Sequence, residues 1–375
     1  MKKVTILALH LGYGGIENAI TTLANSLVNK YEVEILSVYR LYKDPIYDLD
    51  EKVKVKYISN VKPNKNEMRY YLKKKNFKKV LKGLGTSIQT GYVKYIKTIS
   101  VLKKLDTDVL ITTRTLHNSL SGKYANKNIK KIAWEHNHHN YNKKYIKSLC
   151  DSCDNVDYFV AVSKDLEEFY KRYLGDKVVY IPNSLDKLPN RVSKLDSNNL
   201  IAVGRLSKEK AVDDLLKIFK MVSAKNSKLK LHIIGDGPEK TDLLNLAKEL
   251  KLGEKVVFHG FQNKDYINDM LINSALYLMT SHTESFGLVL IEAMSHGVPC
   301  IAFDSAQGAN EIIEDDVNGY LIKERNKEVY ASKVLELIKD NDKRKKLGKK
   351  ARESSKNYSP METLERWSKI INKRK

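Results

Sequence analysis

The sequence predicts an α/β protein made of two doubly wound domains, each a parallel sheet covered by helices on both faces. The chain has 375 residues, which exceeds the size at which a single hydrophobic core stops growing. Short β-branched runs alternate with amphipathic helical patterns along its length. These runs are nearly continuously apolar, as is typical of parallel strands that are buried on both faces.

The same alternation of strand and helix occurs in both halves, which is why two sheets are expected. "KKVTILALH" predicts the first strand, "IENAITTLANSLVNK" the first helix and "YEVEILSVY" the second strand. The remaining strands are expected at 108–113, 130–136, 157–163 and 177–182, and then at 199–205, 228–237, 255–261, 276–281 and 299–304.

The boundary between the domains is expected in "YIPNSLDKLPNRVSKLDSNN", where Pro, Asn and Ser interrupt the pattern. This gives an N-terminal domain at 1–185 and a C-terminal domain at 186–358. Residues 359–375 contain a final helix, "METLERWSKIINK".

Composition indicates a cytoplasmic protein. No stretch of 18 apolar residues occurs, and the N-terminus lacks a long apolar segment followed by a small-residue cleavage site. The three cysteines agree with a reducing compartment and argue against a disulfide framework.

The net charge of +22 is concentrated in one segment, residues 52–104, where 16 Lys and Arg accompany the single acid Glu67. Such segments bind phosphate-bearing polymers or anionic lipid headgroups, although a simply solvated face has the same composition. Here lysines are mixed with Tyr70, Tyr71 and Phe77, which is typical of a helix that lies in a membrane interface.

Two glutamates stand nearly alone in the apolar stretch "SHTESFGLVLIEAMSHGVPCIA", at Glu284 and Glu292. A surface helix would place such charges among other polar residues. Each glutamate is therefore expected to have a partner, one before a helix and one inside it.

Ligands of open α/β sheets bind outside the carboxyl ends of the strands, and this rule selects the other candidate sites. "HLGYGGIEN" follows the first strand, and its Gly14 and Gly15 suit the approach of a phosphate to a helix N-terminus. A nicotinamide cofactor is disfavoured, since the second strand does not end in the acid that would bind a ribose.

Arg205 and Lys210 follow the first strand of the second half, and together they suit a diphosphate. The "GDGP" turn with Gly235 and Gly237 and the "HGF" stretch with Gly260 and Phe261 come after the next two strands. Either turn would let a flat base approach the backbone, although each sequence alone indicates only a turn.

"WEHNHH" follows a strand of the first half and offers His136, His138 and His139. Zinc is a minor alternative, because the nearby pair Cys150 and Cys153 lies before a strand, at the opposite end. A histidine that donates a hydrogen bond to a substrate oxygen is favoured. The stretch Asp106–Asp108 imitates a metal-binding D-x-D motif, but it precedes a strand and is interpreted as a loop.

These motifs together resemble the retaining glycosyltransferases of the GT-B fold, and more narrowly family 4, the "group 1" transferases. The resemblance rests on "GGIE", "VSKDL", "YIPNS", "VGRLSKEK", "GDGP", "HGF" and the E-x7-E pair with "SFG" inside it. It covers nearly the whole chain and is weakest at about 40–130, where such enzymes read their acceptor. The implied fold is two Rossmann-like domains that face a central cleft.

The family's roles transfer to matching residues. Glu292 would bind the ribose hydroxyls of the nucleotide, Glu284 the hydroxyls of the transferred sugar, and Arg205 and Lys210 the diphosphate. Gly15 would close over the donor, and the final helix would return to the first domain with Trp367 as its anchor. His136 would lie near the sugar, and the backbone amides of Phe286, Gly287 and Leu288 would hold sugar and phosphate.

The implied reaction moves a hexose from a nucleotide diphosphate sugar, by default a UDP-hexose, to a glycan or lipid-linked acceptor. The resemblance implies retention of configuration by front-face attack, with no metal or other cofactor. We expect peripheral binding to the inner face of the membrane through residues 52–104. The alternatives are an epimerase or hydrolase-like enzyme of the same fold and a basic nucleic-acid-binding protein, of which the last lacks any recognised motif.

Overall fold

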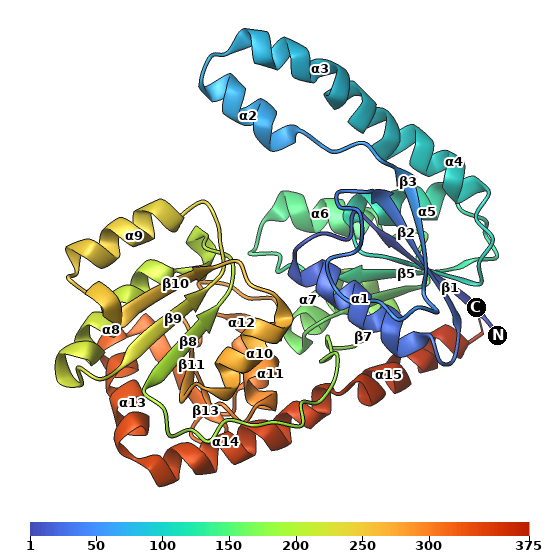
Figure 1. Cartoon of the computed structure of the whole chain (residues 1–375). Coiled ribbons are helices and arrows are strands. Elements are labelled where there is room, and N and C mark those ends of the chain that lie inside the picture. The colour runs from blue at the N-terminus through green and yellow to red at the C-terminus, as the bar shows by residue number, and fades with distance from the viewer. Residues whose placement is uncertain (375) are drawn as a thin grey trace. The chain divides into compact units, whose positions relative to one another are not determined.

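The computed structural model describes residues 1–374, without the side chains of Lys65 and Asn66. The chain divides into two compact units (Figure 1). Unit 1 is Met1–Asp186 together with the chain from Pro360 onward, and unit 2 is Lys187–Ser359. Among the described residues, no helix combines the length and the apolar character needed to cross a bilayer.

Unit 1 contains a seven-stranded sheet in the order β3-β2-β1-β4-β5-β6-β7, with every pair of neighbouring strands parallel. The strands are β1 Lys3–Ala8, β2 Glu32–Tyr39, β3 Lys54–Ser59, β4 Val109–Thr112, β5 Lys130–Glu135, β6 Tyr158–Ala161 and β7 Val178–Tyr180. The helices are α1 Gly15–Leu27, α2 Lys65–Lys73, α3 Phe77–Tyr92, α4 Thr98–Lys103, α5 Thr115–Tyr124, α6 Lys143–Asp151, α7 Lys164–Leu174 and α15 Pro360–Asn372, with a π-helical turn at Val93–Lys97.

Unit 2 contains a six-stranded parallel sheet in the order β10-β9-β8-β11-β12-β13. The strands are β8 Asn199–Val203, β9 Lys230–Ile234, β10 Val256–Gly260, β11 Leu276–Met279, β12 Cys300–Phe303 and β13 Gly319–Ile322. The helices are α8 Val212–Lys225, α9 Lys240–Glu249, α10 Lys264–Ile272, α11 Leu288–Ser295, α12 Gln307–Ile312, α13 Lys327–Lys339 and α14 Asn341–Ser355. The predicted fold class, two doubly wound α/β domains, is therefore confirmed.

Two edge strands were not anticipated from the sequence. β3 reads "KVKYIS" and alternates lysine with apolar residues, because one face of this edge strand is exposed. β13 reads "GYLI" and has only four residues. Neither has the long apolar run by which the inner strands were recognised.

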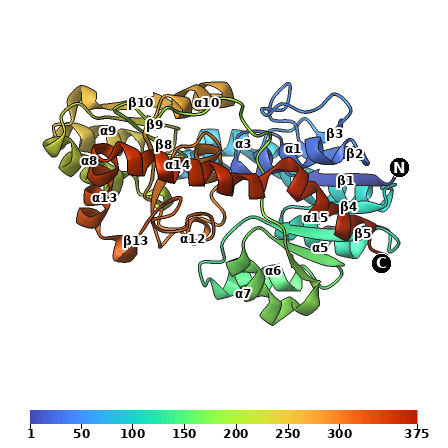
Figure 2. The ribbon, with the colours of Figure 1, turned by 90° about the horizontal axis from the view of Figure 1, so that it is seen from below.

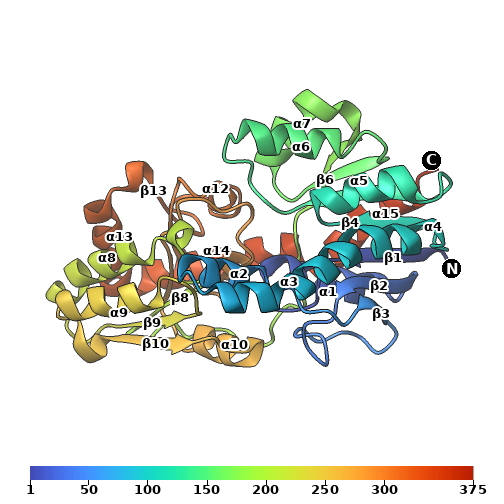
Figure 3. The ribbon, with the colours of Figure 1, turned by 90° about the horizontal axis from the view of Figure 1, so that it is seen from above.

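The basic segment, residues 52–104, runs from β3 to α4, and its helices α2 and α3 lie side by side (Figures 1 and 3). Asn64 Nδ2 donates to the Gly83 carbonyl (2.9 Å) and Ser87 Oγ donates to Asn64 Oδ1 (3.0 Å). No residue of α3 is buried. Its apolar residues therefore remain at the surface, and exposed large apolar side chains recur at Phe77, Leu81, Leu84 and Ile88.

The last helix, α15, packs within unit 1 along α1 (Figure 2). Trp367 is fully buried and meets Trp134 edge to face, with ring centroids 5.1 Å apart. Lys130 Nζ donates to the carbonyls of Ile370 (2.9 Å) and Ile371 (3.1 Å). A buried ammonium thus satisfies carbonyl groups that the last turn of a helix leaves unpaired.

Trp367→Ala is expected to destabilise unit 1 by about 3–5 kcal/mol, because it leaves a large cavity under α15. Met361→Ala is the matched control, since Met361 lies on the same helix with 70% of its surface exposed; it should change stability by less than about 0.5 kcal/mol. Urea unfolding followed by far-UV circular dichroism measures both, and equal effects would refute the anchoring role.

Candidate active site

The carboxyl edge of the unit 2 sheet brings together the residues that the sequence analysis assigned to the donor. Lys210 lies on a short 3₁₀ turn after β8, and its ammonium forms an ion pair with the carboxylate of Glu284, which follows β11. The two side chains are 25% and 18% exposed. A cation and an anion that lie 74 residues apart in the sequence therefore meet where a ligand can reach both.

Arg205 lines the same pocket as Lys210. A pocket at the end of β8 and β11 is lined by Arg205 and Lys210 together with Tyr277, Thr280 and Ser281. The Tyr277 hydroxyl donates to the Val203 carbonyl (3.0 Å) and so joins the two strands at the base of the pocket. The predicted pair of cations thus lines one pocket.

Two hydrogen bonds hold the Lys210 loop against the Glu284 loop. The backbone N–H of His282 donates to the Glu209 carbonyl (2.8 Å), and Thr280 Oγ1 donates to the Ala211 carbonyl (2.9 Å). Ala211 has a left-handed backbone (φ 47°) and turns the chain into α8. The relative position of Lys210 and Glu284 is therefore set by hydrogen bonds to the backbone carbonyls on both sides of Lys210.

The second glutamate lies on α11. Gly287 has a left-handed backbone (φ 97°) and caps this helix, which starts at Leu288. The Phe286 side chain is buried against Tyr358, with ring centroids 5.6 Å apart, so only the Phe286 backbone suits a ligand. The first amides of a helix have no partner within it, and they favour an anion.

Tyr277 lies close to both acids. Burial raises the pKa of its phenol well above the usual value, and the charges of Glu284 and Glu292 act in the same direction. The two carboxylates of the E-x7-E pair therefore belong to one neighbourhood at this edge of the sheet.

The glycines after β9 are required by close backbone packing. A Cβ on Gly235 would lie 1.8 Å from the Gly204 carbonyl oxygen, and one on Gly237 would lie 2.2 Å from that of Leu206. Gly260 is left-handed (φ 67°) and its carbonyl accepts from the Gly235 N–H (2.8 Å). Packing explains these glycines, and contact of a base with them or with the half-exposed Phe261 stays a prediction.

In unit 1, the glycine loop lies against a buried carboxylate. A Cβ on Gly14 would lie 2.1 Å from Glu17 Oε2, while Gly15 has open space around its Cα. Glu17 Oε1 accepts from Arg114 Nη2 (3.2 Å) and lies 3.6 Å from His10 Nδ1. Gly14 therefore makes room for this charge cluster, and Gly15 is open to a ligand.

Arg114 and His10 had not been assigned a role from the sequence. Both directly follow strands, β4 and β1, so the carboxyl-end rule would have found them. His10 opens the "HLGYGGIEN" stretch, whose glycines alone were assigned a role, and Arg114 belongs to no recognisable motif.

His136 follows β5 and is 9% exposed. Its ring lies next to that of Trp134, with centroids 4.2 Å apart, and its Nε2 has no hydrogen-bond partner among the described residues. Burial, with the nearby Arg114, lowers its pKa to about 3, so the ring is neutral at physiological pH. A buried, unpaired ring nitrogen is costly, and a ligand oxygen would satisfy it.

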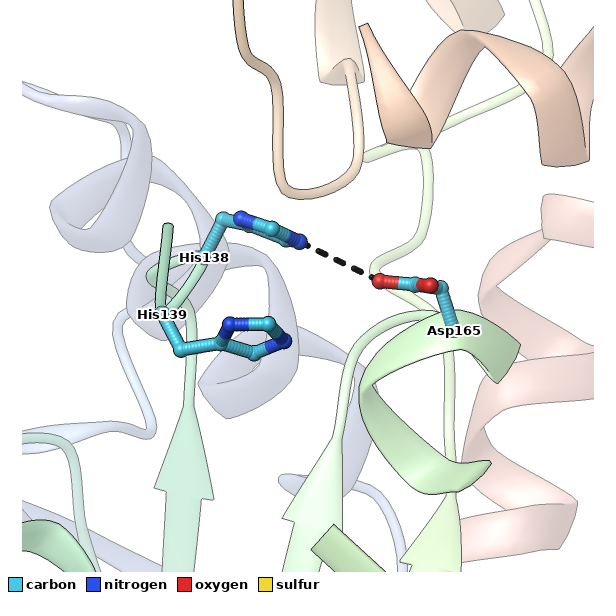
Figure 4. A group of neighbouring side chains, drawn as sticks. All are labelled: His138, His139 and Asp165. Carbon is cyan, nitrogen blue, oxygen red and sulfur yellow. Dashed lines mark hydrogen bonds and ion pairs between the residues drawn. The ribbon is translucent and has the colours of Figure 1, made fainter. Parts of the chain in front are cut away.

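The two other histidines form a cluster with Asp165 (Figure 4). Among the described residues, only His138, His139 and Asp165 bring three metal-type ligand atoms within 4.8 Å of one another. Both Nδ1 atoms accept backbone N–H groups, from Asn140 and Tyr141 (both 3.0 Å). His138 Nδ1 also lies 2.8 Å from Asn140 Oδ1, and its Nε2 faces Asp165 Oδ2 at 3.2 Å. Both ring nitrogens of His138 thus have partners within the protein, Asn140 and Asp165.

The surroundings of Cys153 and of the D-x-D stretch Asp106–Asp108 indicate a structural role. Burial raises the pKa of Cys153 to about 12, so its thiol stays protonated and is a poor metal ligand. Asp108 Oδ2 accepts from the Lys3 N–H (2.7 Å) at the amino end of the sheet. The interpretation of Asp106–Asp108 as a loop agrees with this position.

The two parallel sheets, of seven and six strands, define a class of fold, the GT-B fold. The solved structure of TarM from S. aureus, in complex with UDP, alpha-GlcNAc-glycerol and fondaparinux, matches this chain with a TM-score of 0.80 at 17% identity, covering 100% of both chains. This likeness supports the fold.

The particular family follows from the sequence comparisons. The profile of "Glycosyl transferases group 1" matches residues 183–354. The amylovoran biosynthesis glycosyltransferase AmsD of Erwinia amylovora is 31% identical over 255 residues, covering 60% of this chain and 71% of AmsD. This chain belongs to the glycosyl transferases group 1 family.

A further relative matches almost from end to end. The N-acetylgalactosamine-N,N'-diacetylbacillosaminyl-diphospho-undecaprenol 4-alpha-N-acetylgalactosaminyltransferase of Campylobacter jejuni is 26% identical, covering 96% of both chains. Relatives of this chain thus act in the synthesis of surface polysaccharides and glycolipids.

The buried histidines predict a pH dependence of stability. His117 is 1% exposed, and burial, Arg114 and Lys94 lower its pKa to about 3, as for His136. The unfolded chain binds each proton near pH 6.5, whereas the folded protein binds it only near pH 3. Stability is therefore lost as the pH falls below about 6.5, by about 1.4 kcal/mol per pH unit for each histidine.

His117→Leu should reduce that slope by about 1.4 kcal/mol per pH unit between pH 6 and 4. Urea unfolding at a series of pH values measures the slope in both proteins. An unchanged slope would show that His117 takes up its proton in the folded state.

Proposed function

We propose that this protein is a retaining, family 4 glycosyltransferase that moves a hexose from a nucleotide diphosphate sugar, by default a UDP-hexose, to a glycan or lipid-linked acceptor. The observation that carries the proposal is the Lys210–Glu284 ion pair between two loops that are hydrogen-bonded to each other. Arg205 lines the same pocket as Lys210. The TarM complex with UDP supports the choice of donor, and the diphospho-undecaprenol relative supports a lipid-linked acceptor.

Charge complementarity explains how unit 2 would act. The bond between the anomeric carbon and a phosphate oxygen breaks, and negative charge develops on the leaving diphosphate. Arg205, as a fork, and Lys210, as a point charge, would stabilise that charge together with the amides at the start of α11. Arg205 and Lys210 would supply the positive charge that a metal ion supplies in other enzymes. Metal-independent transfer is therefore part of the proposal.

Two carboxylates would orient the donor. The diphosphate would replace Glu284 as the partner of Lys210. Glu284 would then accept hydrogen bonds from hydroxyls of the sugar. Glu292 on α11 would do the same for the ribose. His136 of unit 1, with its unpaired Nε2, is assigned to a substrate oxygen, and Gly15 to the donor phosphates.

The proposed attack occurs on the front face of the sugar, which retains the configuration. The acceptor oxygen forms the new bond to the anomeric carbon, and its proton goes to the departing phosphate oxygen, so the products are the glycoside and a nucleoside diphosphate. In this scheme Glu284 positions the sugar and forms no covalent bond.

The proposal predicts that the protein binds and slowly hydrolyses a sugar nucleotide. A thermal-shift screen against UDP-, GDP- and ADP-sugars should show one stabilising donor, because a ligand of the folded state raises stability by mass action. Release of the nucleoside diphosphate is then measured with that donor. Absence of both binding and release with every donor would refute the proposed function, and binding followed only by epimerisation would indicate the alternative enzyme.

Arg205→Ala and Lys210→Ala should each lower kcat by about 100-fold to 1,000-fold, as expected for the loss of a preorganised group that stabilises the transition state. Lys208→Ala removes a charge from an exposed neighbour in the same loop and should cost less than about 3-fold. Equal losses in all three variants would show a general effect of charge and not a site.

Glu284→Gln should lower kcat strongly without trapping an intermediate. Intact-mass spectrometry of the wild type and of this variant during turnover tests the front-face scheme. A glycosyl adduct on either protein would overturn it and make a carboxylate the nucleophile.

The proposal includes docking on the inner, anionic face of the membrane through residues 52–104. The exposed stripe Phe77, Leu81, Leu84 and Ile88 repeats at the spacing of one helix face, and exposed lysines such as Lys78 and Lys82 flank it. Such a helix buries its apolar face in the interface while its lysines contact headgroups.

Replacing Lys78, Lys79 and Lys82 with alanine should weaken binding to vesicles containing phosphatidylglycerol by on the order of 100-fold, at about 1 kcal/mol per lysine. The matched control replaces the exposed Lys345, Lys346 and Lys349 of α14 and should have little effect. Liposome flotation at low salt measures both. A wild type without preference for anionic vesicles would contradict the docking.

A further inference from the structure

Arg325 connects the loops of the proposed site although it belongs to none of the motifs in the sequence. It lies directly after β13, at the carboxyl edge of the unit 2 sheet. Its Nη1 donates to the Ser281 carbonyl (3.0 Å) and to Ser305 Oγ (2.9 Å). Its Nη2 donates to the Thr280 carbonyl (2.9 Å) and to Asp214 Oδ2 (2.8 Å). The guanidinium also lies over the Phe303 ring, 4.4 Å from its centroid.

These partners belong to the segments that carry the two charged residues of the site. Thr280 and Ser281 begin the loop that leads to Glu284. Thr280 Oγ1 in turn donates to the Ala211 carbonyl, next to Lys210. Asp214 lies in the first turn of α8, the helix that directly follows the Lys210 loop. One side chain thus contacts the Glu284 loop directly and the Lys210 loop through α8.

The backbone at Arg325 is strained. Glu324 and Arg325 have left-handed backbones, with φ values of 53° and 49°, and neither is glycine. L-residues adopt this conformation reluctantly, and two in succession persist only where the surroundings hold them. The four hydrogen bonds of the guanidinium are such a constraint.

Asp214 holds the guanidinium in place. It is 8% exposed, and its other oxygen accepts from Lys327 Nζ at 2.5 Å. Burial alone would raise the pKa of Asp214, but hydrogen bonds from Lys327 and Arg325 outweigh it and the pKa is lowered. The Asp214 carboxylate is therefore charged at neutral pH and forms an ion pair with Arg325.

We infer that Arg325 is a positioning residue, which fixes the Glu284 loop relative to the Lys210 loop and so sets the geometry of sugar and diphosphate. The inference rests on the proposed function. A lysine would keep the charge but not the planar fork, and one ammonium on a flexible stem cannot hold both carbonyls, the serine and the aspartate in one plane.

Arg325→Lys tests the geometry separately from the charge. It should lower kcat by about 10-fold or more and change the KM for the donor less, because a displaced reacting group costs rate more than binding. Lys327→Met is the matched control, since it removes the cation on the other oxygen of Asp214 at 2.5 Å and touches neither loop carbonyl; kcat should stay within about 3-fold. Equal losses in the two variants would overturn the inference.

A double-mutant cycle distinguishes positioning from a general loss of structure. If Arg325 acts through Glu284, Arg325→Lys should cost less than about 3-fold in donor hydrolysis when Glu284 is already glutamine, although it costs about 10-fold or more alone. Additive losses would show that Arg325 does not act through Glu284 and would overturn the inference.

Hydrogen–deuterium exchange gives a readout that does not need activity. Peptides that cover 279–288 should exchange faster in Arg325→Lys than in the wild type and in Lys327→Met, with peptides of α13 unchanged. Unchanged exchange at 279–288 would overturn the inference whether or not the protein is a transferase. An inactive wild type with every donor would refute the proposed function alone.

Discussion

The parallel direction of the strands in unit 2 is the constraint on which the rest of the site depends. Because all six strands run the same way, each loop that follows a strand emerges at one edge of the sheet. Arg205 and Lys210 after β8, Glu284 after β11 and Arg325 after β13 are thereby gathered from 121 positions of sequence, 205–325. The core beneath them is closely packed and apolar, so the edge is a rigid support for charged loops.

The charged side chains of this edge lie next to partners of opposite sign. Lys210 faces Glu284, and Asp214 faces Arg325 and Lys327. Unit 1 follows the same rule, with Glu17 between His10 and Arg114. Ion pairs of this kind are partly desolvated. Removing one partner therefore destabilises the protein, because the other is left as an uncompensated charge away from water. A diphosphate that displaces Glu284 from Lys210 would exchange one anion for another, which keeps the cation neutralised throughout.

Patterns in the sequence identified the fold and most of the proposed donor site, and failed in recognisable places. Edge strands β3 and β13 were missed because an edge strand is short or exposed on one face. Close packing against 204–206, which the sequence does not reveal, requires glycine at Gly235 and Gly237 whether or not a base contacts them. His138 and Asp165 lie 27 residues apart and their hydrogen bond leaves no trace in the local pattern.

By itself, the sequence determined the class of fold, the family and the residues with charges to offer, because hydrophobic period and motif spacing are local properties. Only the tertiary structure decided which of those charges meet. It paired Lys210 with Glu284, left Nε2 of His136 without a partner among the residues that the structure describes, and hydrogen-bonded Arg325 to Thr280 and Ser281, which lie more than 40 positions earlier in the chain. The physical reason is that a hydrogen bond or an ion pair depends on distances of a few ångström, and those distances are set by how strands and helices pack.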